Sequence, residues 1–195
     1  YGILGLRTEF MEEKAKVSVL LIYKYYKNRE GLLTEVLSEL YDGDSYEKLA
    51  AYVEIFEQME SPTIDDIAIL FATVQQGFRS LDRWKRLQIL AASAEITELR
   101  TRLAAIHLDQ QQRVVDFLQI AIRSVGSTYP GTTEESISGA VALARPLASL
   151  IMTQSFGSVL DDLIDYEVRE AAAEDMKVLL RLIIDSVLTA GNKSS

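Results

Sequence analysis

Residues 11–33 read Met-Glu-Glu-Lys-Ala-Lys-Val-Ser-Val-Leu-Leu-Ile-Tyr-Lys-Tyr-Tyr-Lys-Asn-Arg-Glu-Gly-Leu-Leu. Ser18 directly precedes a compact apolar run, residues 19–23, and a serine in that position can cap the first turn of a helix. Taken alone, a run this short is also compatible with a β-strand, because its periodicity does not separate the two structures. The sequence on either side of the run therefore has to decide what it forms.

On both sides of this run the sequence favours helices. A short helix over about residues 9–15 is predicted to end at a tight turn at Lys16 and Val17. Asn28 is a good N-cap for a helix that extends to about Tyr41, with leucine and valine side chains along one face. Two short helices joined by a tight turn form a compact helix-turn-helix.

The same stretch closely resembles the helix-turn-helix of TetR-like transcriptional regulators. The resemblance implies an all-α protein in which an N-terminal DNA-binding domain, residues 1–41 with its linking helix, precedes a helical effector-binding and dimerisation domain, residues 42–195. The matching elements are Lys14-Ala15-Lys16-Val17-Ser18, Ile22-Tyr23-Lys24-Tyr25-Tyr26, Lys27-Asn28-Arg29-Glu30 and Leu32-Leu33.

The chain departs from the family pattern in several places. The family's first helix would lie before Tyr1, so the DNA-binding domain is expected to be incomplete at its N-terminus. Lys16 stands where the turn usually has glycine, and a lysine adopts the left-handed backbone conformation only at a cost of about 1 kcal/mol. Residues 19–21, Val-Leu-Leu, lack side chains that hydrogen-bond to bases, so direct readout would rely on thymine methyl groups or on other residues.

The resemblance places the DNA-binding residues in and around the second short helix, whose N-terminal residues can face base edges in a major groove. Tyr23, Tyr25 and Arg29 correspond to phosphate-contacting positions of the family. The alternative is that the tyrosines are core side chains and the lysines are solvated charges. The full set of predicted DNA-binding residues is Ser18, Val19, Leu20, Leu21, Tyr23, Lys24, Tyr25, Lys27 and Arg29.

The charge distribution is consistent with an anionic partner at the N-terminus. The 195 residues include 29 acidic and 20 basic side chains, giving a net charge of −9. Residues 1–33 hold six bases and four acids, whereas the remainder carries a net charge of −11. Such asymmetry is a hint of nucleic-acid binding, although ordinary scatter of surface charge is an alternative interpretation.

Most of the remaining chain also has a helical pattern, in keeping with its 10 glycines and 3 prolines. Gly126 is expected to end one helix, Thr132 and Glu135 to form the capping box of the next, and Pro146 to kink it. A Ser61-Pro62 pair is expected to cap another helix. The predicted helices are about 44–59, 62–78, 80–94, 96–125, 132–163 and 169–188.

Residues 136–163 are apolar on almost every face, which predicts that they are covered on more than one side. A second subunit is one natural cover, and the alternative is a central helix in a monomeric bundle. We therefore expect a homodimer with a four-helix interface. Its predicted interface residues are Ala140, Ala144, Ile151, Met176, Leu179, Leu180, Ile183 and Val187.

An effector pocket is expected inside the helical bundle, lined mainly by apolar and aromatic side chains. For His107 the favoured interpretation is instead a half-buried, hydrogen-bonded histidine. The ligand is expected to be small and largely apolar, and neutral or cationic, because the body of the chain is acidic. The candidate pocket residues are Phe71, Phe78, Trp84, His107, Gln110 and Phe117.

Other functional classes have little support in the sequence. There are no cysteines and only one histidine, so no metal site or other cofactor is expected. The acidic pairs Asp65-Asp66 and Asp161-Asp162 do not face each other on a helix, which argues against an enzyme. The longest uncharged run, residues 146–160, is too short to span a bilayer.

The sequence thus predicts a cytoplasmic, ligand-responsive regulator, favoured to be a repressor, that binds a pseudo-palindromic DNA operator as a homodimer. The alternative is a dimeric helical ligand-binding or interaction module whose DNA-reading end has been lost or has degenerated.

Overall fold

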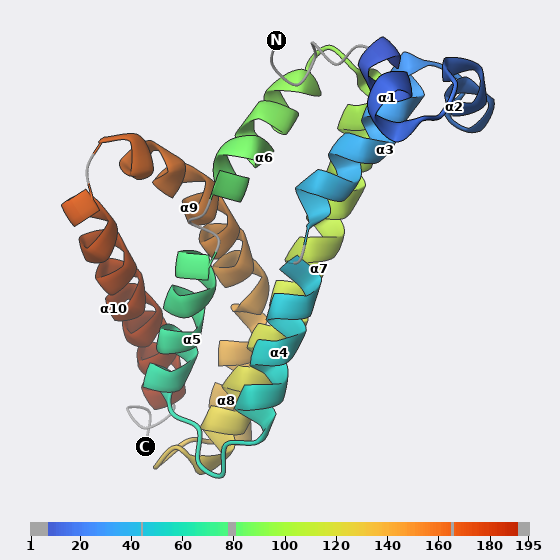
Figure 1. The fold of residues 1–195 in the computed structure, drawn as a ribbon. Coiled ribbons are helices and arrows are strands. Elements are labelled where there is room, and N and C mark those ends of the chain that lie inside the picture. Colours follow the sequence, from blue (N-terminus) through green and yellow to red (C-terminus); the bar gives the residue numbers. More distant parts are fainter. Residues whose placement is uncertain (1–7, 44, 78–80, 165, 191–195) are drawn as a thin grey trace. The chain divides into compact units, whose positions relative to one another are not determined.

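The chain is helical throughout the residues that the computed structural model describes, which are 8–43, 45–77, 81–164 and 166–190 (Figure 1). This confirms the predicted all-α fold class, and residues 19–23 belong to a helix. The described residues form no strand, and their helices are α1 (Thr8–Ala15), α2 (Val19–Tyr26), α3 (Arg29–Asp42), α4 (Ser45–Glu57), α5 (Ile64–Gly77), α6 (Leu81–Ala92), α7 (Thr97–Thr128), α8 (Glu134–Ala142), α9 (Ala144–Ile164) and α10 (Tyr166–Ala190).

The helices divide into two compact units, and the division differs from the predicted boundary after residue 41. The first unit comprises residues 1–44 and 81–109, so it contains α6 and the first part of α7 as well as α1 to α3. The second unit comprises residues 45–80 and 110–195. A continuous boundary fails because α3 packs on α6, a helix that lies far from it in the sequence.

Within the first unit, an arginine of α6 and an arginine of α7 bind side-chain and backbone groups of α3. The guanidinium group of Arg86 lies over the ring of buried Tyr41, 5.6 Å from its centroid. Nη2 of Arg86 also donates a hydrogen bond of 3.1 Å to the carbonyl of Asp42, in the last turn of α3. Arg102 of α7 forms a bidentate ion pair with Glu35, with N···O distances of 2.6 and 2.9 Å. These contacts hold α3 along its length.

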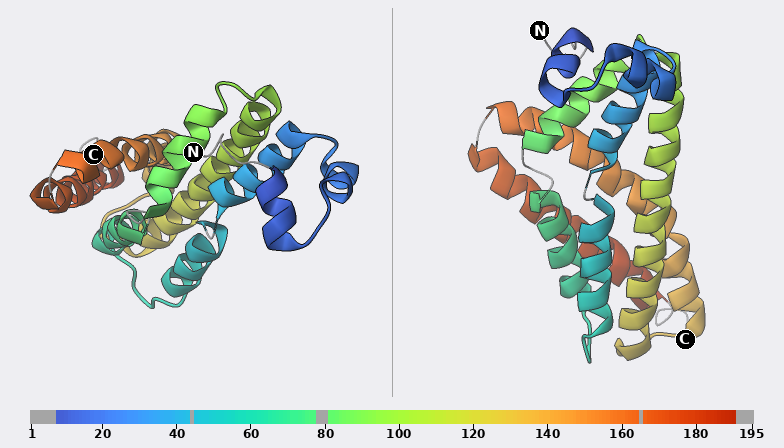
Figure 2. Two further views of the ribbon diagram at one scale, coloured as in Figure 1. Left: turned by 45° about the horizontal axis from the view of Figure 1, so that its top comes forward. Right: turned by 45° about the vertical axis from the view of Figure 1, so that its right-hand side comes forward.

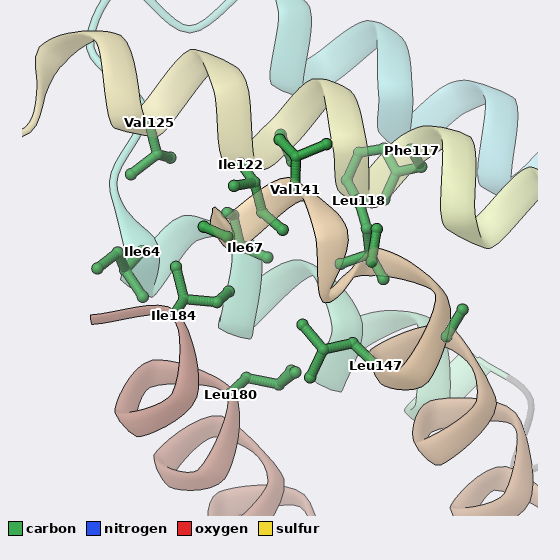
Figure 3. Close-up of a cluster of buried hydrophobic side chains, with 14 of the residues drawn as sticks. Ile64, Ile67, Phe117, Leu118, Ile122, Val125, Val141, Leu147, Leu180 and Ile184 are labelled. Atoms are coloured by element: carbon green, nitrogen blue, oxygen red, sulfur yellow. The ribbon is translucent and has the colours of Figure 1, made fainter. Parts of the chain in front are cut away.

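The core of the second unit is built from apolar side chains of α5, α7, α8, α9 and α10 that point toward a common centre (Figure 3). Ile67, Leu118 and Leu180 are fully buried there. Phe56 of α4 packs edge-to-face on Phe117, with ring centroids 5.8 Å apart. Full burial of each large aliphatic side chain contributes about 1.5–3 kcal/mol to folding, so this cluster is the main source of stability in the unit.

Two predicted helix ends in the second unit are wrong. Gly126 does not end α7, which continues to Thr128. A β-carbon on Gly126 would lie 2.8 Å from Cγ1 of Ile137, so glycine is present because α8 approaches α7 closely there. The capping box of α8 is formed by Thr133 with Ser136, while Thr132 donates a hydrogen bond of 2.6 Å to the Gly126 carbonyl.

Pro146 has a stronger effect than the predicted kink. Helix α8 ends at Ala142 and α9 begins at Ala144, so the predicted single helix is interrupted at Leu143, three residues before the proline. Proline has no N–H with which to bond the carbonyl four residues earlier, and its ring crowds that carbonyl. The interruption therefore falls where the helical hydrogen bond from residue 146 to the carbonyl of residue 142 cannot form.

Helix α5 also begins later than predicted. Its N-terminal cap is Thr63 rather than Ser61: the Thr63 Oγ1 accepts a hydrogen bond from the Asp66 N–H, and the Thr63 N–H donates one of 2.8 Å to the Asp66 carboxylate. Such a reciprocal pair satisfies two of the backbone N–H groups that every helix start leaves without helical partners.

Within the described part of the chain, Glu134–Gln154 is long and apolar enough, by length and composition, to cross a membrane. It includes the break at Leu143, and Val141 and Leu147 within it belong to the core cluster in Figure 3. One such stretch, identified by length and composition alone, is weak evidence for a membrane span.

Candidate nucleic-acid interface

Helices α1 and α2 are joined by a three-residue turn, residues 16–18, and lie near the N-terminal end of α3 (Figure 2). Both predicted caps are confirmed. The Ser18 hydroxyl accepts a hydrogen bond of 3.3 Å from the Leu21 N–H. The Asn28 side-chain carbonyl accepts one of 2.8 Å from the Gly31 N–H. The N-terminal ends of α2 and α3 are thus each capped by a residue that the sequence identifies.

The turns on either side of α2 are strained. Lys16 has φ 54°, as expected from its place in a turn that favours glycine. Lys27 has φ 67° and ψ −54°, and the Asn28 N–H donates a hydrogen bond of 2.8 Å to the Tyr26 carbonyl. That combination is the γ-turn of positive φ, which is rare and strained. The strain at Lys27 had no signal in the sequence, because a lysine gives no reason to expect it.

Gly31 permits a close approach between α2 and α3. A β-carbon at this position would collide with the backbone carbonyl oxygen of Tyr26. The first turn of α3 therefore lies directly against the last residue of α2. No pattern in the sequence assigns a role to Gly31, and only its place within residues 11–33 could have drawn attention to it.

Helix α2 exposes large apolar side chains on its outer face. Leu20 is 83% exposed, Leu21 43% and Tyr25 74%. Ile22 is buried and anchors the helix, while Val19 and Tyr23 are half-buried. The alternative that both tyrosines are core side chains is therefore wrong for Tyr25. Exposed apolar groups gathered on one short helix are typical of a surface that another molecule covers.

Basic side chains lie on α2 and in the turns at its two ends. Lys16, Lys24 and Lys27 are exposed, and Arg29 is half-buried at the start of α3. Ser18 is exposed as well, although its hydroxyl is engaged in capping. The predicted DNA-binding residues therefore lie on α2, in its two flanking turns and at the start of α3, with Val19 the least exposed of the predicted base-facing positions.

The predicted effector residues are divided between the two units. Trp84 and His107 belong to the first unit, whereas Gln110 and Phe117 belong to the second. Phe117 is a core side chain packed against Phe56, so its assignment to a pocket is corrected. Trp84 is 46% exposed, and His107 is half-buried, as favoured from the sequence. Phe78 and the side chain of Phe71 lie outside the described residues.

A groove of about 300 Å³ lies between α5 and α10 of the second unit. Asp65 on α5 pairs with Arg181 on α10 at 3.3 Å, and Lys177 pairs with Glu174 at 2.8 Å. None of its residues was predicted, because charges at helical spacing look like a solvated face. The lining consists of Asp65, Ala68, Ile69, Glu174, Lys177, Val178 and Arg181.

Half of the predicted dimer-interface residues are buried inside the chain. Ala140, Ala144, Ile151 and Leu180 are covered by the core of the second unit, so they have no surface to offer a partner. Ile183 and Val187 are half-buried against the same core, and the side chain of Met176 is outside the described part. Among the described side chains of α10, the large apolar ones that are exposed are Val178, Leu179 and Leu182.

No group of three or more potential metal ligands occurs among the described residues. Comparisons with known proteins add no relationship: no family model, no curated protein and no solved structure matches this chain.

Proposed function

We propose that the protein is a TetR-like, DNA-binding transcriptional regulator in which α1, the turn at residues 16–18 and α2 act as a helix-turn-helix. The observation that carries the proposal is the exposure of Leu20 and Leu21 in the first turn of a short, capped helix surrounded by lysines. The resemblance of residues 11–33 to this family supports the same conclusion.

Base recognition in this proposal is mainly apolar. The major groove displays the methyl group of thymine, and apolar side chains discriminate thymine by contact with it. Leu20 and Leu21 are suited to that contact, because they are exposed at the end of α2 that recognition helices direct toward base edges. We therefore expect the preferred sites to be rich in A·T pairs.

Most of the affinity for DNA is expected to come from contacts with the phosphate backbone. Lys24, Lys27 and Tyr25 are exposed and can reach phosphates, and each neutralised phosphate releases condensed counterions. The chain as a whole carries a net charge of −9, so its acidic body is repelled by DNA. Binding should therefore use the α2 end and should weaken steeply with salt.

The proposal includes a homodimer on a pseudo-palindromic operator, because one short helix reads only a few base pairs. Exposed Val178, Leu179 and Leu182 on α10 are candidates for the contact between subunits. A cytoplasmic location and repression of transcription follow from the same resemblance, and no catalytic activity is proposed.

Control by a small, largely apolar effector is also proposed from the resemblance. The groove between α5 and α10, with Ile69 and Val178 among charged residues, is a described cavity in which to test for such a ligand. The competing proposal is a dimeric helical module without DNA-reading ability. It is favoured by the apolar character of residues 19–21, which lack hydrogen-bonding groups.

Selection from a pool of random DNA duplexes separates the two proposals. The regulator should enrich a related set of sequences, arranged as an inverted repeat. Leu20→Glu should abolish the enrichment, whereas Leu108→Glu, at another exposed leucine, on α7, should leave it unchanged. Recovery of unrelated sequences only would favour the module without DNA-reading ability.

A further inference from the structure

Two lysines stand at positive φ where the rest of the described chain uses glycine. The other described residues with positive φ are Gly43 and Gly131. Lys16 and Lys27 are the exceptions, and they lie at opposite ends of the same helix, α2. Glycine adopts these conformations without steric cost, whereas a lysine is strained there. Both turns of the candidate interface therefore carry a cost that a single-residue change to glycine would remove.

Nothing among the described residues accounts for a lysine at position 16. It lies in the turn before Ser18, and its side chain is exposed to solvent. Backbone strain of this kind persists only where the surrounding structure enforces it, and strained residues cluster at functional sites. The function that suits an exposed ammonium group is binding an anion.

The position of the pair fits a DNA duplex. A helix of eight residues is about 12 Å long, and the major groove is about 12 Å wide and bordered by phosphates of both strands. Cations just beyond the two ends of α2 are therefore placed to meet phosphates when the exposed face of Leu20 and Leu21 enters the groove.

We infer that Lys16 is a phosphate-binding residue, and that Lys16 and Lys27 act as a pair of cations gripping the DNA backbone on either side of α2. This rests on the proposed function and adds a contact to it: Lys16 belongs to the turn and not to the recognition helix. The strain at both positions is the cost of placing an ammonium group at each end of the helix.

Three substitutions at position 16 separate charge from strain. Lys16→Gly removes both, Lys16→Gln removes the charge and keeps the strain, and Lys16→Arg keeps both. Arg123→Gln, at an exposed position on α7 in the second unit, removes the same charge elsewhere. Affinity of the full chain for a labelled, mixed-sequence DNA duplex is measured at several salt concentrations, alongside thermal unfolding.

We expect the affinity for DNA to depend on the charge at position 16, and the thermal stability to depend on the backbone strain there. The Gly and Gln variants should both bind more weakly, with a salt slope lower by about 0.9 for each bound copy, and the Arg variant should match the unsubstituted chain. The Gly variant should unfold about 2 °C above the Gln variant. The same comparison at Lys27, with Gly and Gln, should give the same grouping.

Unchanged affinity and salt slope in the Gly and Gln variants would overturn the inference while leaving the proposed function intact. An equal effect of Arg123→Gln would also overturn it, because the loss would then reflect net charge alone. Absence of duplex binding by the unsubstituted chain at low salt would instead refute the proposed function, and this inference with it.

Discussion

The backbone carbonyl oxygen of Tyr26 occupies the space that a β-carbon on Gly31 would need. The two residues close the junction between α2 and α3, with the γ-turn at Lys27 between them. The angle between α2 and α3 is therefore set by a contact that involves backbone atoms. Any side chain at position 31 must move the helix that carries the candidate DNA-reading face.

Gly31→Ala should be strongly destabilising for this reason. Backbone atoms cannot yield as the end of a flexible side chain can, so we expect a loss of about 2 kcal/mol or more in the free energy of unfolding, measured in urea. Binding to a DNA duplex should fall as well, because α2 would be displaced.

The matched control is Gly139→Ala in α8. A β-carbon there would lie 3.6 Å from Cγ1 of Val187, an ordinary contact. Alanine is the better helix former, so stability should stay the same or rise by about 0.5–1 kcal/mol. Equal losses in the two variants would contradict the specific role assigned to Gly31.

The two arginines that fasten α3 should differ in importance. Arg86→Ala removes both the contact with the buried ring of Tyr41 and the hydrogen bond to the Asp42 carbonyl, so we expect a loss of about 1–2 kcal/mol. Arg102→Ala breaks an ion pair whose side chains are about half exposed, and should cost about 0.5 kcal/mol. Chemical denaturation of the two variants checks the order, and the reverse order would show that the ion pair is the stronger restraint.

Tyr129 should make stability fall at alkaline pH. Its hydroxyl donates a hydrogen bond to the Asp185 carboxylate, and this bond is the main cause that raises the pKa of Tyr129 above 10.0, with Arg181 opposing. Because the pKa is raised in the folded chain, the contribution is present below about pH 10 and is lost as pH rises through the folded value. Burial raises the pKa of Tyr41 in the same direction.

Absorbance of the ionised tyrosines, followed during an alkaline titration, tests this assignment. Tyr129→Phe should remove one late-titrating group and reduce the loss of stability above pH 10. If the titration curves of the unsubstituted chain and the Tyr129→Phe variant differ only by one tyrosine of ordinary pKa, the hydrogen bond to Asp185 is not maintained in solution.

The dimer is tested best at Leu182. Ile183 is half-buried against the core, so a charge there would disturb the fold itself. Leu182 is 61% exposed, and Leu182→Glu should leave the helical content intact. If α10 joins two subunits, this variant should sediment as a monomer while the unsubstituted chain sediments as a dimer. An unsubstituted chain that sediments as a monomer at micromolar concentration would remove the dimer from the proposal.

Local signals in the sequence were sufficient to predict a helix end where a single capping side chain determines it. Ser18 and Asn28 cap α2 and α3 as predicted, because a cap needs only a side chain and the backbone three residues later. Thr132 and Thr133 are both threonines, and only the contacts of the folded chain select the second. Gly126 illustrates the same limit, because its reason is Ile137 on another helix.

Long-range packing explains the remaining differences. The compact units differ from the predicted division after residue 41, because α6 and part of α7 join the first unit through contacts between segments distant in the sequence. Ala140, Ala144 and Ile151 are covered by their own chain, which periodicity could not distinguish from cover by a second subunit. The exposed face of α2 was predictable because it lies within one contiguous motif, whereas the α5–α10 groove joins distant segments.

Hydrogen exchange of the full chain, with and without a saturating DNA duplex enriched by selection, tests the central claim most directly. The account predicts slower exchange in peptides covering residues 16–31, which contain α2 and both strained lysines. Duplex binding that leaves these peptides unchanged and slows exchange only in α7 to α10 would contradict the claim that α2 is the DNA-binding element.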